Sequence, residues 1–227
     1  MSTAVLPSSW SGRPVRAVLF PDQVRGVARA VRHLRRPGTR ALYVSATGIG
    51  KALASVRIAD ALQARLVLFV VPTLDLAAQT ALAWRADGHT EHMLIVSSMD
   101  ASGHDALAAR RVGSTSDYRA LAGLMALVGE GEDQTPALTV ICTYDSLDKI
   151  EATRHSRFDV PPFDLAVMDE AHRIAGRADK KWAVVNDATG PWSYHSVTPH
   201  TGPSFCSVCA SVCGTMVHDT ATDRGTL

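Results

Sequence analysis

The sequence predicts an α/β domain in which a mostly parallel sheet carries helices on both of its faces. Short apolar runs alternate with amphipathic segments, and parallel strands joined by crossover helices produce this alternation. The runs are apolar almost throughout, as expected for strands buried on both faces of a sheet. Polar motifs follow these runs directly, at the strand ends where ligands bind in open α/β sheets.

The expected elements follow one another along the first 170 residues or so. Valines, alanines and a leucine at helical spacing predict a helix from about Asp22, which Pro37 and Gly38 would end. Further helices are expected over 53–64, 75–84 and 118–128, and strands over 41–44, 66–71, 93–96, 138–142 and 165–168. Residues 97–117 are mixed and polar, and 129–136 is expected to form an acidic loop.

A change of composition near residue 190 divides the chain into an expected domain over 1–189 and a tail over 190–227. The tail is rich in Ser, Thr, Gly, Cys and His and shows no helix or strand periodicity, so we expect it to be irregular or disordered. Cys206, Cys209, Cys213 and His218 are residue types that ligate zinc, but their spacing matches no zinc finger or knuckle. Reduced thiols are the preferred interpretation.

Charge and hydropathy bear on whether the protein binds nucleic acid, spans a membrane or is secreted. With 23 basic and 22 acidic residues the net charge is only +1, so overall charge does not indicate a nucleic-acid binder. The first 40 residues hold eight arginines and one acid, which would either meet phosphate or form a solvated face. No apolar run is long enough to span a membrane and no secretory signal is recognisable, so we expect a cytoplasmic protein without a membrane partner.

The segment between the first expected strand and the second expected helix is typical of a phosphate-binding loop. It consists of Ala46, Thr47, Gly48, Ile49 and Gly50, followed by Lys51. Glycines allow the backbone N–H groups to face a phosphate, and the N-terminus of the following helix adds a favourable dipole. The lysine would reach the β- and γ-phosphates of a nucleotide such as ATP.

The residue after this lysine departs from the general pattern of such loops. Ala52 stands where a serine or threonine hydroxyl normally ligates Mg²⁺. Ser55 lies about one helical turn further on and is a poor substitute. We therefore expect residues 46–52 to bind nucleotide but hydrolysis to be impaired.

An acidic box of Asp169, Glu170, Ala171 and His172 follows the last expected strand. Asp169 would hold Mg²⁺, Glu170 would orient and deprotonate the attacking water, and His172 would couple the nucleotide site to the rest of the protein. Phosphoryl transfer depends on such positioning and charge neutralisation. Two adjacent acids alone are more often a solvated turn, but these follow an apolar strand and a phosphate loop.

In the order and spacing of these motifs the chain resembles superfamily 2 DEAD/DEAH-box helicases with an ATPase lobe of the restriction-enzyme type. The resemblance covers about residues 15–188 and implies a RecA-like P-loop NTPase domain that uses ATP and Mg²⁺. It implies catalytic roles for Lys51, Asp169, Glu170 and His172. Gln23 matches the family's glutamine motif and would contact adenine.

Two further segments match those that contact nucleic acid in this family. Pro72 and Thr73 lie in the first, and Thr143 and Tyr144 lie in the second. By themselves, Pro72 and Thr73 would be only a strand exit and a helix cap, and Thr143 and Tyr144 only a turn. The resemblance implies a nucleic-acid partner, DNA rather than RNA, and no obligate protein partner is inferable.

The chain also departs from the family. Residues 187–189 resemble its Ser/Thr-Ala-Thr motif but lack the first hydroxyl and a preceding strand, and the 227 residues hold no second lobe, so we expect a truncated N-terminal lobe. Two functions remain open: an ATP-hydrolysing, DNA-binding helicase-like protein of the DEAH type, or a non-catalytic nucleic-acid-binding lobe or inactive remnant. A different phosphate-loop NTPase is disfavoured by the acidic box.

Overall fold

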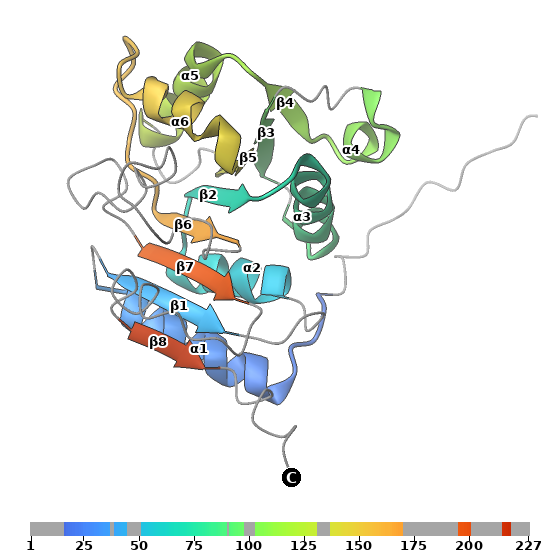
Figure 1. Ribbon diagram of the computed structural model, residues 1–227, viewed down its shortest axis with the longest axis vertical. Coiled ribbons are helices and arrows are strands. Elements are labelled where there is room, and N and C mark those ends of the chain that lie inside the picture. The colour runs from blue at the N-terminus through green and yellow to red at the C-terminus, as the bar shows by residue number, and fades with distance from the viewer. Residues whose placement is uncertain are drawn as a thin grey trace, which may run out of the picture.

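The protein is an α/β domain built on one parallel sheet, as the computed structural model in Figure 1 shows. The structure describes residues 16–36, 39–44, 51–89, 91–97, 103–130, 137–169, 195–200 and 215–218. Eight strands pair in the order β4-β3-β5-β2-β6-β7-β1-β8, and every pair is parallel. The expected fold class is confirmed.

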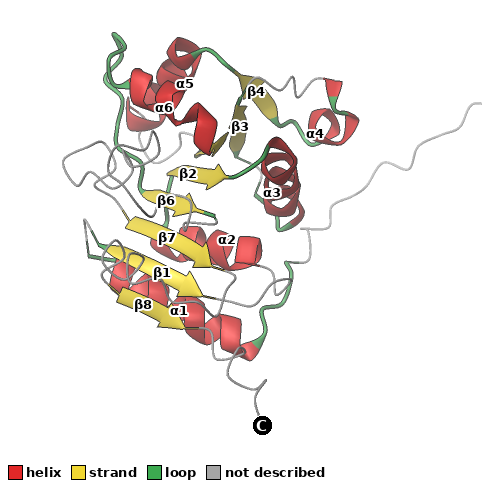
Figure 2. Ribbon diagram, in the orientation of Figure 1, coloured by secondary structure: helices red, strands yellow, loops and turns green. Residues whose placement is uncertain are grey.

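Helices and strands alternate along the chain as far as β6, and Figure 2 distinguishes the two by colour. Those of the first half are α1 (Pro21–Leu34), β1 (Arg40–Val44), α2 (Lys51–Leu62), β2 (Leu66–Val71), α3 (Leu74–Ala86) and β3 (His92–Val96). Those of the second half are α4 (Asp105–Ala109), β4 (Gly113–Thr115), α5 (Tyr118–Glu130), β5 (Leu138–Thr143), the 3-10 helix η2 (Tyr144–Ser146), α6 (Leu147–Thr153), β6 (Leu165–Met168), β7 (His195–His200) and β8 (Thr215–His218).

The central strands β2, β5 and β6 are buried on both faces, which explains their continuous apolar sequences. All six residues of β2 and all six of β5 are buried. Alternate residues of β2 enter different cores: Val67 and Phe69 pack with residues of α1, α2, α3 and α4, whereas Leu66 and Leu68 pack with residues of α5 and α6. Helices α1 to α4 therefore cover one face of the sheet and α5 and α6 the other.

The described elements exceed the expected ones in two places. Residues 97–117, expected to be mixed and polar, contain the short α4 and β4, and α6 follows β5 where no helix was expected. These elements have three to seven residues, too few for a periodic pattern to emerge. They are held by tertiary contacts: Leu107 of α4 is fully buried, and β4 pairs with β3.

The tail also differs from the irregular structure expected of it. Two of its segments, β7 and β8, are strands on either side of β1, and β7 also pairs with β6. Neither segment has a strand-like alternation, so only pairing with neighbouring strands specifies them. The rest of the tail lies outside the described residues, and the division near residue 190 stays a prediction.

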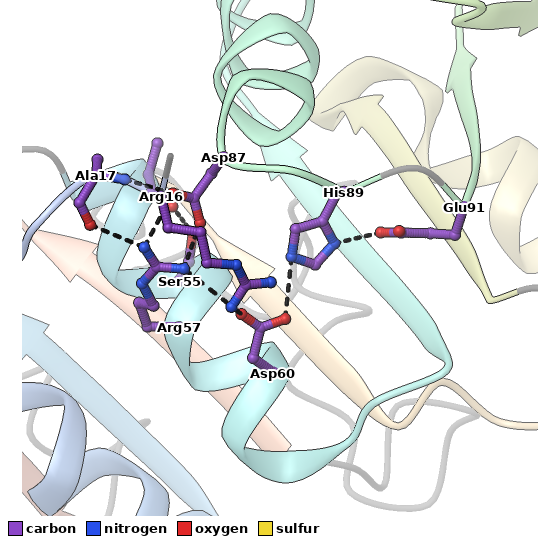
Figure 3. A network of polar contacts seen from close by, with 9 residues as sticks. Arg16, Ala17, Ser55, Arg57, Asp60, Asp87, His89 and Glu91 are labelled. Carbon is purple, nitrogen blue, oxygen red and sulfur yellow. Dashed lines mark hydrogen bonds and ion pairs between the residues drawn. The ribbon is translucent and has the colours of Figure 1, made fainter. Parts of the chain in front are cut away.

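A network of charged groups joins the segment before α1 to α2 and to the turn after α3 (Figure 3). Arg57 of α2 forms a two-pronged contact with Asp87 at 2.5 and 2.9 Å, and Asp87 is 3% exposed. The Arg57 guanidinium also donates to the carbonyl of Ala17, and Arg16 pairs with Asp60 at 2.8 Å. These contacts fix the start of the described chain against α2.

His89 is the second centre of this network and lies between two carboxylates. Its Nε2 is 3.0 Å from Asp60, and its Nδ1 contacts Glu91. Burial by itself lowers the pKa of His89, but hydrogen bonds and charges from Asp60 and Glu91 outweigh it and raise the pKa to about 9. His89 is therefore a cation at neutral pH.

Candidate nucleotide and nucleic-acid site

The predicted motifs that the structure describes meet at one edge of the sheet, where the parallel strands end. Val70 pairs with both Met168 of β6 and Cys142 of β5, so these three strands end in register. β1 joins the same edge through β7. This carboxyl edge is where α/β sheets bind their ligands.

The flanks of the predicted phosphate loop have the expected strand–loop–helix order. β1 ends at Val44 and α2 begins at Lys51, which is half-buried. Residues 45–50, with Ala46 to Gly50 of the prediction, lie outside the described residues. Lys51 therefore stands at the N-terminus of a twelve-residue helix, where the helix dipole favours an anion.

Ala52 is the second residue of α2, and Ser55 does not take over its missing hydroxyl. The Ser55 side chain is 1% exposed, and its Oγ donates to the carbonyl of Ala52 at 2.7 Å. The hydroxyl is thus engaged by the backbone of its own helix. Metal ligation by Ser55 would require this hydrogen bond to break.

Asp169 directly follows β6 and is anchored through its backbone on two sides. Its N–H donates to the carbonyl of Val70 at 2.8 Å, and its carbonyl accepts from the Tyr144 hydroxyl at 2.6 Å. Tyr144 is 1% exposed and Asp169 is half-buried, so this hydrogen bond is partly buried. Glu170 and His172 lie outside the described residues.

The two predicted nucleic-acid segments follow neighbouring strands, β2 and β5. Pro72 and Thr73 come after β2, and the Thr73 Oγ1 caps α3 by accepting from the Leu76 N–H at 3.3 Å. Thr143 ends β5, and its hydroxyl lies 3.1 Å from that of Ser146. The polar groups after β5 are thus pre-positioned, and Tyr144 links them to the acidic box.

Gln23 lies in the first turn of α1 with its side chain 2% exposed. Its Oε1 accepts from the backbone N–H of Phe20 at 2.8 Å, which stabilises the start of the helix. α1 packs closely on β1, because Gly26 leaves room for the Tyr43 ring. Gln23 therefore belongs to the helix that covers β1, and its contact with adenine stays a prediction.

Among the strands that sequence reasoning missed, β7 lies nearest the predicted motifs. β7 lies between β1, which leads to the phosphate loop, and β6, which leads to the acidic box. It contains Ser196 and Thr198, a hydroxyl pair similar to the family's Ser/Thr-Ala-Thr motif, whereas residues 187–189 lie outside the described residues. The β-branched Val197 and Thr198 were only a weak signal, because two such residues without alternation do not define a strand.

The described ranges hold neither a cluster of metal ligands nor a membrane-spanning helix. There, no three His, Cys, Asp or Glu side chains gather into a metal site. Cys206, Cys209 and Cys213 lie outside those ranges, so zinc binding stays untested. No described helix has both the length and the apolar character needed to cross a membrane.

Cys142 is buried in β5 and unlike a reactive thiol. The side chain is 0% exposed, and burial raises its pKa above the ordinary value. A thiol becomes nucleophilic or binds metal as the thiolate, which this environment disfavours. Cys142 is therefore a core residue.

Solved structures of larger enzymes share this fold. A nuclease-deletion mutant of the Type ISP restriction-modification enzyme LlaGI, in complex with a DNA substrate mimic, matches 80% of this chain with 23% identity and a TM-score of 0.66. The ATP-dependent Type ISP enzyme LlaBIII, bound to DNA, matches 92% with 18% identity and a TM-score of 0.68. The Hef helicase domain of Pyrococcus furiosus matches 86% with 17% identity and a TM-score of 0.54.

This chain spans only a part of those proteins: 15% of the LlaGI chain, 16% of the LlaBIII chain and 36% of the Hef helicase domain. Sequence comparison found no matching relative among curated proteins. A family model, described as the res subunit of type III restriction enzymes, matches residues 16–194 and so includes both flanks of the phosphate loop and the acidic box, and it ends just before β7. The chain therefore belongs to the family of the type III restriction enzyme res subunit.

Proposed function

We propose that this chain is an ATP-binding, DNA-binding helicase-type lobe of the DEAH class, with hydrolysis limited by Ala52. The observation that carries the proposal is the meeting of Lys51, Asp169, Thr73 and Thr143 at one edge of the sheet, each directly after a strand or at the start of the following helix. Membership of the res-subunit family supports it.

In this proposal ATP binds between the ends of β1 and β6. Backbone N–H groups of residues 46–52 and the Lys51 ammonium hold the phosphates, and Gln23 faces adenine. Glu170 orients the attacking water, and His172 couples the site to its surroundings. The position of Lys51 at the start of α2 supports this assignment.

Asp169 is the proposed ligand of Mg²⁺. When bound, this ion would neutralise charge at the phosphates. A carboxylate suits Mg²⁺, and the two backbone hydrogen bonds of Asp169 fix its position. The opposite side of the site offers no hydroxyl, because Ala52 has none and Ser55 is engaged. We infer that Mg²⁺ would keep an additional water there, which weakens its hold.

DNA is the proposed nucleic acid, because the LlaGI and LlaBIII structures contain a DNA substrate mimic and DNA. Pro72 and Thr73 after β2 and Thr143 and Tyr144 after β5 would contact its backbone, with Tyr144 using its main-chain groups because its side chain is buried and its hydroxyl donates to Asp169. We assign β7 to the coupling of the two sites, since it lies between β1 and β6. The expected compartment remains the cytoplasm.

The test is ATP binding and turnover, measured with and without DNA, for the original chain and two variants. Glu170→Gln should retain ATP binding and lose turnover, because the amide cannot deprotonate water. Ala52→Thr should raise turnover roughly tenfold, a gain of about 1.4 kcal/mol from a restored metal ligand.

The controls and contrary outcomes are defined in the same assay. Ser55→Ala, which removes a hydroxyl engaged within α2, should leave turnover unchanged. Absence of ATP binding at millimolar concentration would overturn the nucleotide assignment. Absence of any effect of DNA on turnover, together with absence of DNA binding, would overturn the nucleic-acid assignment.

The second candidate function is a nucleic-acid-binding lobe without catalysis. The engagement of Ser55 with the Ala52 carbonyl favours it, because no hydroxyl then replaces the missing ligand. ATP binding without turnover in the original chain, unchanged in Ala52→Thr, would support this candidate over the first.

A further inference from the structure

A groove outside all the predicted motifs lies between the start of α5 and the segment that follows α6. Its volume is about 600 Å³. One wall is formed by Asp117, Tyr118, Arg119 and Ala120, and the other by His155, Ser156, Arg157 and Phe158. α5 and α6 pack against each other on one face of the sheet, so the two walls are held together (Figure 1).

Each wall carries an arginine beside an aromatic ring. The Arg119 guanidinium lies 5.5 Å from the centre of the Tyr118 ring, and that of Arg157 lies 5.2 Å from the centre of the Phe158 ring. Arginine is well suited to stacking on a ring while its N–H groups remain directed to an anion. The rings thus restrain two long side chains at little entropic cost.

The guanidinium charges of the groove are only partly balanced by its own residues: Asp117 interacts with the charge of Arg119, and the Arg119 Nε donates to the Tyr118 hydroxyl at 3.3 Å. Neither Arg119 nor Arg157 forms an ion pair with any residue in the described ranges. Asp117 is the one carboxylate among the groove residues, and its Oδ1 accepts from the Arg119 backbone N–H at 2.8 Å. The groove therefore offers two guanidinium groups to an anionic ligand.

The α5 wall of the groove lies next to the sheet edge at which the nucleic-acid segments lie. Val96 of β3 pairs with both Thr115 at the end of β4 and Cys142 of β5, so β4 ends at the same edge as β5. α5 begins three residues after β4 ends. β4 and β5 are separated by one strand, which corresponds to about 10 Å at about 4.8 Å per strand.

We propose that the groove between α5 and the segment after α6 binds backbone phosphates of a single nucleic-acid strand, with Arg119 and Arg157 as the ligands. This proposal rests on the proposed function, because it extends the path of the nucleic acid from Thr143 towards the β4 side of the sheet. An arginine on each wall that forms no ion pair with the described residues suits phosphates along a strand, and contacts of this kind do not depend on base sequence.

The experiment measures binding of a fluorescein-labelled single-stranded DNA to the full chain by anisotropy, over a series of salt concentrations. Arg119→Ala/Arg157→Ala should weaken binding about tenfold at low salt. It should also lower the slope of log affinity against log salt by about 1.4, since each phosphate contact contributes about 0.7 for single strands. ATP binding should not change.

Two control variants separate charge from position. Arg32→Ala/Arg110→Ala removes the same charge from two exposed arginines outside the groove and should weaken binding less than twofold. Arg119→Lys/Arg157→Lys keeps the charge without the planar fork and should have an intermediate affinity with the original salt slope. Circular dichroism checks that each variant is folded.

The outcomes distinguish this proposal from the proposed function. If Thr143→Ala weakens DNA binding and Arg119→Ala/Arg157→Ala does not, the groove proposal is wrong and the proposed function stands. An equal loss in Arg32→Ala/Arg110→Ala also overturns the groove proposal, because net charge then explains the effect. If the original chain does not bind DNA, the nucleic-acid part of the proposed function fails and the groove proposal with it.

Discussion

At the scale of single residues, two glycines in helices have opposite environments. A Cβ atom on Gly26 of α1 would lie 2.8 Å from Cε2 of the Tyr43 ring, closer than van der Waals contact allows. Tyr43 is 1% exposed, so the ring has little room to move. A Cβ atom on Gly123 of α5 would lie 3.5 Å from the Phe158 ring, an ordinary contact.

We therefore expect Gly26→Ala to destabilise the protein and Gly123→Ala to stabilise it. Overpacking costs about 1–3 kcal/mol, which exceeds the 0.5–1 kcal/mol or so that alanine contributes to a helix. The net loss for Gly26→Ala is then about 1 kcal/mol, measured as the free energy of unfolding in urea. Gly123→Ala is the matched control, and equal stability of the two variants would contradict the close packing of α1 on β1.

Tyr144 is a second residue whose role the structure reveals, through its hydroxyl group. It donates to the Asp169 carbonyl at 2.6 Å across 25 residues of sequence. Tyr144→Phe removes this donor and keeps the ring, so we expect a loss of about 1 kcal/mol in stability. Because Tyr144 acts by positioning Asp169, Tyr144→Phe should also reduce the stimulation of ATP turnover by DNA. The affinity for ATP should be nearly unchanged.

The control for this prediction is Thr153→Val. It removes a buried hydroxyl that donates within α6 to the Ile150 carbonyl and does not contact Asp169. It should cost similar stability and leave the stimulation by DNA intact. If both variants reduce the stimulation equally, the Tyr144–Asp169 hydrogen bond has no special part in coupling.

At the scale of elements, His89 links α2 to the turn between α3 and β3 in a pH-dependent way. Its folded-state pKa of about 9 lies above the ordinary value of 6.5. A raised pKa stabilises the fold fully below pH 6.5, and this contribution is lost as the pH rises from 6.5 through 9. The pKa values of Asp60 and Glu91 are lowered by His89 against the opposing effect of burial, so their contribution is lost in acid, below their ordinary values of 3.8 and 4.5.

We expect the free energy of unfolding to fall between pH 6.5 and pH 9.5, and His89→Gln to flatten this dependence. Between these two pH values the original chain should lose about 1–2 kcal/mol more free energy of unfolding than His89→Gln. This is less than the full shift in pKa implies, because Asp60 and Glu91 retain 26% and 18% exposure to solvent. Urea denaturation at both pH values measures it. His104→Gln, an exposed histidine before α4, should retain the slope, and a retained slope in His89→Gln would assign it to other groups.

At the scale of the whole molecule, the parallel register converts distant motifs into one site. Lys51 and Asp169 are far apart in sequence, yet β1 and β6 are separated only by β7. Because all described strands run the same way, every loop after a strand emerges at the same edge. The proposed ATP site and the proposed DNA contacts then share that edge, and the α5 wall of the groove lies next to it. Separate variants can test each of the three sites.

Much of the fold could be predicted from the sequence because its strands are continuously apolar and its longer helices periodic. The strands β2, β5 and β6 and the helices α1, α3 and α5 lie within a few residues of their expected bounds. The short α4, β4 and α6 could not be predicted, because three to seven residues do not define a period. Strand β7 was missed because its partners, not its composition, stabilise it.

The sequence by itself determined the family, the fold class and the position of each motif after a strand, since local apolar patterning and motif spacing are properties of the chain alone. Only the tertiary structure decided how these motifs are arranged around the sheet. Packing decides the Tyr144–Asp169 hydrogen bond and the hydrogen bond from Ser55 to the Ala52 carbonyl. It also places Arg119 and Arg157 on the two walls of one groove. Burial and register fix such contacts, and neither is written in the local sequence.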